Sequence, residues 1–132
     1  MPIATTEILI RAFLFLLLPC LAWADDVACH VTYGGADQVL VAKPVDSPYA
    51  VSPVAIGSYF LFRIVFQRMP ADLASIKIYT YSDSDDGPAP IHQATYPYPP
   101  QKSRGHYGFT GLHFVYEPMR DGELQYWCEL RR

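Results

Sequence analysis

The chain has 132 residues, a formal net charge of −3 at pH 7, and an aromatic content of 14%. A mildly acidic chain lacks the basic surface that phosphate backbones require, so the composition argues against nucleic acid as a partner. Twelve prolines and ten tyrosines are spread between apolar runs, a composition that disfavours helices and favours strands.

Residues 1–24 have the pattern of a secretory signal peptide. Arg11 precedes an apolar run of about seven residues, and the small residues Ala22 and Ala24 stand just before Asp25. The run is well short of the ~20 apolar residues that span a bilayer. We therefore expect cleavage after Ala24, no membrane anchor after signal removal, and a periplasmic or secreted protein with residues 25–132 as a single domain.

The predicted export determines how the cysteines are interpreted. Cys20 lies inside the signal, and Pro19 before it is not the small residue expected before a lipid-accepting cysteine. The mature chain then holds Cys29 and Cys128, and two cysteines in an oxidising compartment allow one intramolecular connectivity. We expect a Cys29–Cys128 disulfide that closes a loop of roughly 100 residues, for which chain entropy predicts about 4.7 kcal/mol of stabilisation.

The first half of the mature chain predicts three strands. Cys29 to Tyr33 and Gln38 to Ala42 flank the turn signal Gly34-Gly35 and predict an opening hairpin. Lys43 to Pro53 contains three prolines, so we expect it to cross between elements or to form an irregular edge. Ile56 to Phe66 has apolar residues on both faces and predicts a single strand in the middle of a sheet.

The second half continues the β pattern. Gln67 to Leu73 predicts a turn that has room for one short helical turn, followed by a strand from Ser75 to Tyr81. Further strands are expected at Ile91 to Tyr96, Phe109 to Tyr116 and Glu123 to Leu130, and Asp121-Gly122 is a hairpin signal before the last of them. The acidic run from Asp83 to Gly87 between strands does not match a calcium-loop register and is expected to be a solvated turn.

About seven short strands, regular turn signals and no helical period predict an all-β fold. The expected architecture is an immunoglobulin-like antiparallel β-sandwich, closed by the Cys29–Cys128 disulfide. A small β-barrel is the alternative. Either architecture places the first and last strands close together.

The aromatic loop from Pro97 to Gly108, between the predicted strands Ile91 to Tyr96 and Phe109 to Tyr116, is the first candidate site. Tyr96, Tyr98 and Tyr107 flank a dozen-residue segment rich in proline, glycine and charge that includes Arg104. Tyrosine offers a flat apolar face and a polar tip, and it is enriched at recognition surfaces. These residues predict a binding site for a protein partner. The alternative is that the tyrosines pack the loop onto the sheet.

The histidines are the second candidate site. His92, His106 and His113 fall within about 20 residues, and neutral imidazole is a common ligand for copper and zinc. The three lie on different predicted elements, so their convergence depends on the fold. The alternative is that they are ordinary strand and loop residues.

The sequence contains no Gly-x-Ser-x-Gly motif, and both mature cysteines are expected to be oxidised, so neither a serine nor a cysteine nucleophile is indicated. We therefore expect a binding module and not an enzyme, with no cofactor. Its predicted role is to hold a protein partner through the aromatic loop and the strand Ile56 to Phe66. The alternative function is a periplasmic copper or zinc carrier that uses the three histidines.

Overall fold

The computed structural model describes residues 25–102 and 105–132. The predicted signal peptide and the candidate Arg104 lie outside the described residues. The strands are β1 (Asp26–Tyr33), β2 (Ala36–Ala42), β3 (Val54–Ile56), β4 (Phe60–Gln67), β5 (Ser75–Ser84), β6 (Gly87–Pro97), β7 (His113–Glu117) and β8 (Gly122–Arg131). Two short 3-10 turns, η1 (Pro48–Ala50) and η2 (Ala71–Leu73), are the described helical elements.

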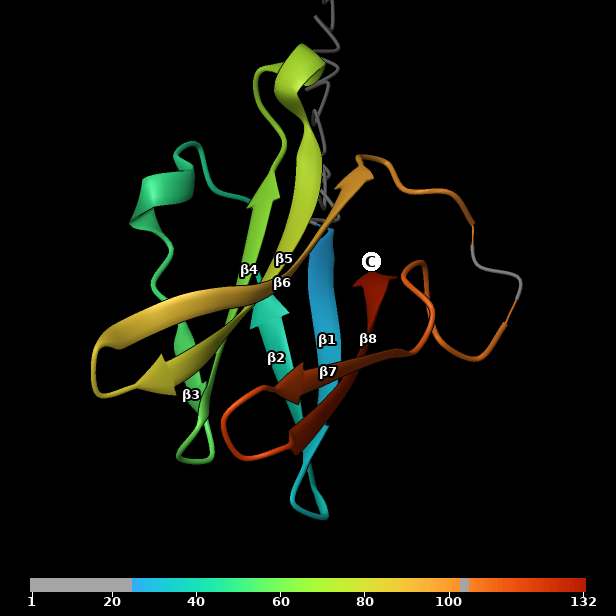
Figure 1. The fold of residues 1–132 in the computed structure, drawn as a ribbon. Helices are drawn as coiled ribbons and strands as arrows, with labels where there is room; N and C mark the ends of the chain where they lie inside the picture. The colour runs from blue at the N-terminus through green and yellow to red at the C-terminus, as the bar shows by residue number, and fades with distance from the viewer. Residues whose placement is uncertain (1–24, 103–104) are drawn as a thin grey trace, which may run out of the picture.

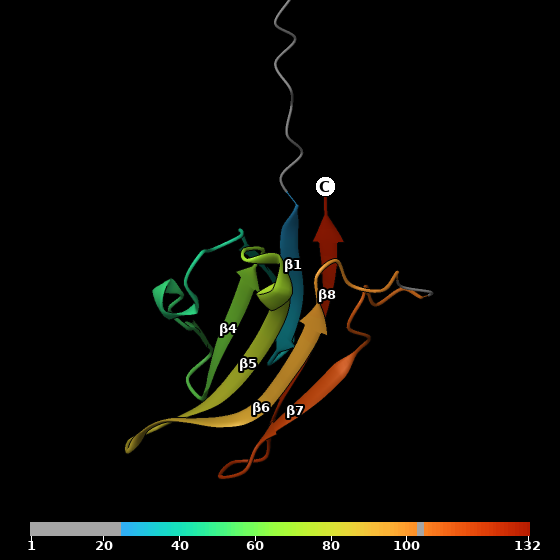
Figure 2. The ribbon, with the colours of Figure 1, turned by 90° about the horizontal axis from the view of Figure 1, so that it is seen from above.

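The strands form two four-stranded antiparallel sheets that pack face to face (Figure 1). Sheet A has the order β2-β1-β8-β7, and sheet B has the order β3-β4-β5-β6. The predicted all-β sandwich is thus confirmed, with eight strands where about seven were expected. Seen from above, β6 of sheet B and β7 of sheet A lie side by side along one margin of the sandwich (Figure 2).

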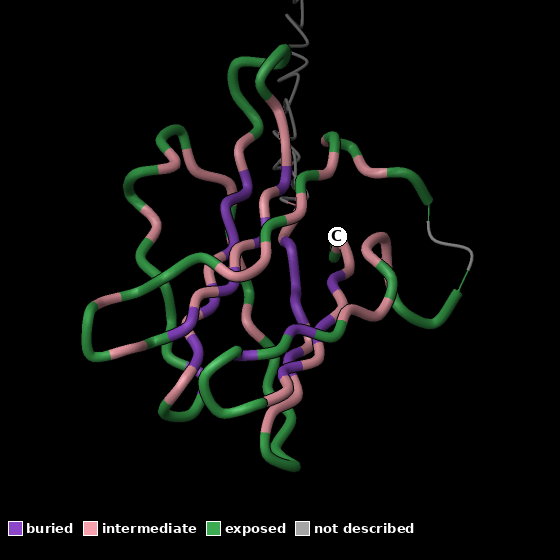
Figure 3. The backbone as a smooth tube through the Cα atoms, viewed as in Figure 1, coloured by how far each residue is buried: buried purple, intermediate pink, exposed green. Residues whose placement is uncertain are grey.

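The core lies between the two sheets and follows the two-residue period of the strands. The buried apolar side chains come from the inward faces of β1, β3, β4, β5, β7 and β8, as the purple segments in Figure 3 show. The largest of them are Tyr126, Phe60, Phe62 and Phe66. β4 supplies three of these four and lies between β3 and β5, so it has the mid-sheet position that its sequence pattern predicted.

The prediction of one continuous strand from Ile56 to Phe66 was wrong. β3 ends at Ile56 and β4 begins at Phe60, with Gly57 in the turn at φ +60°. A Cβ added at Gly57 would lie 2.2 Å from Cε1 of Tyr33. The turn therefore requires glycine both for its backbone conformation and for its close approach to β1.

The disulfide joins the first and last strands as predicted. Cys29 of β1 and Cys128 of β8 are directly opposite each other within sheet A, with an S–S distance of 2.06 Å, and both are fully buried. The bond therefore ties neighbouring strands of one sheet and does not bridge the two sheets. A disulfide is typical of proteins that mature in an oxidising compartment.

The proline-rich segment from Lys43 to Pro53 crosses from sheet A to sheet B, as expected. Arg63 on the outer face of β4 fixes this crossover, since its guanidinium donates to the carbonyls of Pro48 and Val51. The expected helical turn after Gln67 is η2. Among the residues that the structure describes, no helix has the length and apolar character needed to cross a membrane.

The expected strand from Phe109 to Tyr116 begins later than predicted, at His113. Before it, the chain runs as a loop beside β8, where Gly108 forms an isolated parallel bridge with Cys128. Phe109 N–H donates to the Cys128 carbonyl at 3.0 Å. This loop occupies the edge of sheet A beyond the end of β7.

Candidate functional site

The outer face of sheet A carries a group of exposed aromatic and apolar side chains. The strand register places His30 of β1 opposite Val39 of β2 and opposite Trp127 of β8, and Gln125 of β8 opposite Phe114 of β7. We call this surface the aromatic face, and it comprises Trp127, Tyr107, Phe114 and Tyr116, with Val39 and Val41 at its margin. Tyr107, Phe114 and Tyr116 are 46%, 51% and 57% exposed.

Trp127 lies at the centre of this face between two other rings. The His30 ring stacks on it with centroids 3.8 Å apart and planes at 4°, and Tyr107 meets it edge-on at 6.1 Å. Stacked and edge-on arrangements are the favoured geometries of aromatic pairs. Trp127 is therefore fixed in one orientation, with Tyr107 beside it in solvent.

Gly108 is the residue that brings Tyr107 to this position. Its φ is +57°, and a Cβ there would lie 1.9 Å from the backbone oxygen of Cys128. The contact is reinforced by Thr110, whose hydroxyl accepts the Cys128 N–H at 2.8 Å. The chain then alternates across the sheet edge, with Tyr107 on the outer face and Phe109 packed against the core.

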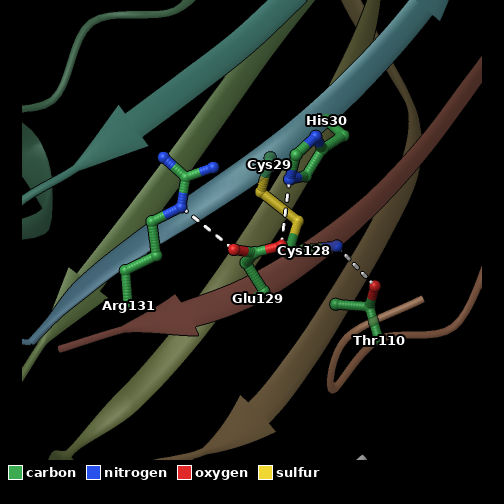
Figure 4. A network of polar contacts seen from close by, with 6 residues as sticks. All are labelled: Cys29, His30, Thr110, Cys128, Glu129 and Arg131. Carbon is green, nitrogen blue, oxygen red and sulfur yellow. Dashed lines mark hydrogen bonds and ion pairs between the residues drawn. A yellow bond between two sulfur atoms is a disulfide. The ribbon is translucent and has the colours of Figure 1, made fainter. Parts of the chain in front are cut away.

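Figure 4 shows a polar network of Arg131, Glu129 and His30, the residue whose ring stacks on Trp127. Arg131 donates to Glu129 at 3.0 Å, and the other carboxylate oxygen of Glu129 lies 3.0 Å from Nε2 of His30. Partial burial pushes the pKa of Glu129 upward, but the hydrogen bonds from Arg131 and His30 outweigh it and the pKa lies below its usual value. These hydrogen bonds fix the His30 ring against Trp127, and Glu129 and Arg131 give the aromatic face a charged rim.

The other tyrosines of the candidate loop point elsewhere. The Tyr98 ring packs on Phe66 at 4.9 Å, and its hydroxyl donates to Asp25. The Tyr96 ring meets Phe109 edge-on at 5.3 Å. The structure therefore shows the packing role for Tyr96 and Tyr98, and it presents Tyr107 to solvent.

The predicted histidines converge in part. His92 of β6 and His113 of β7 meet where the two sheets lie side by side, with ring centroids 5.4 Å apart. Nε2 of His92 lies 2.6 Å from the hydroxyl of Tyr126, and Nε2 of His113 lies 3.0 Å from the Thr110 carbonyl and 3.2 Å from the hydroxyl of Tyr96. These contacts connect sheet B to sheet A, and we call the group the histidine seam.

The hydrogen-bond partners of His92 and His113 bear on the protonation of the seam. A carbonyl only accepts, so Nε2 of His113 carries a proton and donates to Thr110. The Tyr126 side chain is fully buried and that burial raises its pKa, so its hydroxyl stays protonated and shares a hydrogen bond with Nε2 of His92. Burial lowers the pKa of His92, and the charge on protonated His113 lowers it further. Neutral His92 is therefore the form that the seam accommodates.

A metal centre would need more ligands than this pair provides. Within residues 25–102 and 105–132, no group of three or more histidine, cysteine, aspartate or glutamate side chains is arranged to bind a metal. His106, the third predicted ligand, lies exposed on the loop before Tyr107. Of the three predicted metal ligands, the structure brings together His92 and His113.

Sequence reasoning did not select Trp127, Phe114 or Tyr116 as site residues. The signal was present in the alternation of β7, where Phe114 and Tyr116 alternate with the inward-facing His113, Val115 and Glu117. The position of Trp127 beside His30 and Tyr107 depends on strand register, which could not be predicted from the sequence. A search for aromatic residues at the outward positions of predicted strands would have found the first two.

Comparison of the chain with protein-family models, with curated proteins and with solved structures returned no match. The functional conclusion therefore depends on the geometry of the molecule itself.

Proposed function

We propose that this protein is an exported, non-catalytic binding module that holds a protein partner on the aromatic face. The observation that carries the proposal is the stacked pair of His30 and Trp127, with Tyr107 edge-on to Trp127 and with exposed Phe114 and Tyr116 on the same open sheet face. Export to the periplasm or the cell exterior is supported by the disulfide and by the predicted signal peptide.

The composition of the face favours a protein over other ligands. Aromatic residues and arginine are enriched at protein–protein interfaces, whose centres are apolar and whose rims are polar. Trp127 is ordered by its stacking before any partner arrives, which reduces the entropy lost on binding. Glu129 and Arg131 supply a polar rim beside the tryptophan.

The test compares the protein that co-purifies with wild type and with variants of the face. Tyr107→Ala with Phe114→Ala should lower the yield of co-purified partner by about tenfold or more, since such anchors carry most of the affinity of an interface. Tyr49→Ala is the matched control, because Tyr49 is 94% exposed on η1, outside the aromatic face. Unchanged thermal unfolding of the double variant shows that the fold is intact.

Equal recovery of the partner with the double variant and with wild type would overturn the proposal. Retention of wild type on a polysaccharide resin that the double variant loses, without any co-purified protein, would also overturn it in favour of a sugar ligand.

A further inference from the structure

We infer that β2 is a dimerisation edge, which pairs antiparallel with β2 of a second copy of this chain. The inference goes beyond the proposed function and does not depend on it, since Phe114 and Trp127 lie on β7 and β8 and Tyr107 lies on the loop before β7. It depends on the backbone and charges of β2.

The four sheet edges differ in how they are protected against pairing. β3 has three residues and follows Pro53, while β6 carries Pro88, Pro90 and Pro97, which cannot donate to a ladder. The five-residue β7 lies beside β6 through the histidine seam (Figure 2). β2 has seven residues and, between Asp37 and Lys43, neither proline nor charge.

The side chains of β2 are correspondingly exposed. Val39 and Val41 are 45% and 52% exposed on the outer face. On the inner side, Leu40 and Ala42 border a groove of about 380 Å³, which is also lined by Phe62 and Ile64 of β4 and by the crossover between sheets A and B. Long uncharged edges of this kind promote pairing with another strand.

The hydrogen-bond pattern shows which groups of β2 face outward. The backbone N–H and C=O of Cys128 are engaged by Thr110 and Phe109, so they point away from Cys29. Cys29 and Cys128, with Cα atoms 4.0 Å apart, are therefore a non-hydrogen-bonded pair. Strand alternation then directs the Cys29 backbone toward Leu40, and it directs the backbone groups of Val39 and Val41 to the open edge.

One antiparallel register about a two-fold axis places opposite charges of the two copies across from each other. With Leu40 opposite Leu40 of the second copy, Val39 lies opposite Val41, and Asp37 lies opposite Lys43 at both ends of the paired strands. The four residues in these pairs, Asp37, Val39, Val41 and Lys43, all lie on the outer face. Each Asp37 carboxylate therefore lies directly across from the Lys43 ammonium of the other copy. The Leu40 side chains of the two copies then lie opposite each other on the inner face of the extended sheet.

Within one chain, neither Asp37 nor Lys43 is held by a fully buried partner. The Lys43 side chain is 79% exposed, and its ammonium lies 4.0 Å from a carboxylate oxygen of Asp26, at the outer limit of an ion pair. Asp37 accepts a hydrogen bond from exposed Thr32 with one oxygen, Oδ1. The paired dimer extends sheet A into eight continuous strands and brings the two aromatic faces onto one surface.

Sedimentation equilibrium of the exported protein over a range of concentrations tests this inference. Wild type is expected to form a dimer. Asp37→Lys and Lys43→Asp each place like charges together at both ends, and each should raise the dimer dissociation constant by about tenfold. The double swap, Asp37→Lys with Lys43→Asp, restores opposite charges and should bring the constant back to within about threefold of wild type.

Asp85→Lys, on the exposed turn between β5 and β6, is the control that changes net charge away from the edge. A wild-type protein that is monomeric at every concentration would overturn the inference. So would a dimer that is unaffected by the single swaps, or a double swap that behaves no better than the singles. The Tyr107→Ala, Phe114→Ala variant should remain dimeric, which separates this test from that of the proposed function.

Discussion

His92 is a residue whose chemistry follows from its place between the two sheets. Its Nε2 lies 2.6 Å from the hydroxyl of buried Tyr126, and its ring centroid lies 5.4 Å from that of His113. A positive charge on His92 would therefore lie in a partly buried site beside a second imidazole. The titratable side chains that contact His92 among the described residues are Tyr126 of β8 and His113 of β7. The seam thus opposes protonation of His92.

The pH dependence of stability follows from this environment. The pKa of His92 is lowered from 6.5 by burial and by His113, so the unfolded chain binds the proton more readily than the folded chain. The free energy of unfolding is therefore not reduced by His92 above pH ~6.5, and it falls as the pH is lowered from there toward the depressed pKa. Thermal unfolding at pH 7.5 and pH 5 should show a smaller difference in Tm for His92→Gln than for wild type.

His106→Gln is the matched control for this prediction, since His106 is exposed on the loop. It should keep the pH dependence of wild type. A His92→Gln protein with the same difference in Tm as wild type would show that protonation of His92 does not destabilise the seam.

Among the structural elements, the loop from Tyr107 to Gly111 shows where strand boundaries could not be predicted from the sequence. The pattern predicted the strands well where period-two alternation meets turn residues, as in β1, β2, β5 and β8. It extended the strand at Phe109 too early, because the Gly108 bridge to Cys128 is a tertiary contact across 20 residues. It also joined β3 to β4, because a single glycine in an apolar run did not reveal the turn.

The candidate site was predictable to the same extent. Tyr107 was selected from composition, and it is exposed on the aromatic face. The inward direction of Tyr96 and Tyr98 follows from pairings with Ile76 of β5 and with Phe66, which no local pattern encodes. Residues that become neighbours only through strand register, such as His30 and Trp127, were not accessible to sequence reasoning.

Gly108→Ala tests whether this glycine places the loop. The added Cβ meets the Cys128 carbonyl at 1.9 Å and φ is positive, so we expect destabilisation by about 2 kcal/mol or more from backbone strain and the displaced loop. Urea unfolding measures the loss. Because Trp23 is in the predicted signal peptide, the fluorescence of mature protein reports on Trp127, and it should change when Tyr107 moves.

Gly111→Ala is the control, since its φ is +74° but no atom lies within 4 Å of the added Cβ. It should cost about 1 kcal/mol, the strain of positive φ alone. Equal losses in the two variants would show that the close approach to Cys128 does not matter.

At the scale of the whole molecule, the disulfide connects the two ends of the chain across 99 residues. The unfolded state of the oxidised protein is therefore a large closed loop, whose lost entropy favours the fold by about 4.7 kcal/mol in the chain-entropy account. This is comparable to the net stability of many domains.

Replacing both cysteines, Cys29→Ala with Cys128→Ala, should lower the free energy of unfolding by about 3–5 kcal/mol, as measured by denaturant titration. Cys20→Ala should leave the mature protein unchanged, because Cys20 belongs to the predicted signal peptide. A loss below about 1 kcal/mol in the double variant would contradict a stabilising role for the bond.

The whole molecule combines a rigid sandwich with an open aromatic face, and the central claim is that a protein partner occupies this face. Site-specific photo-crosslinking in the exporting cell tests it most directly. A photoreactive residue at position 107 or 114 should give one discrete crosslinked protein, while the same residue at position 49 should not. Absence of a crosslinked protein from positions 107 and 114, or the same product from position 49, would contradict the account.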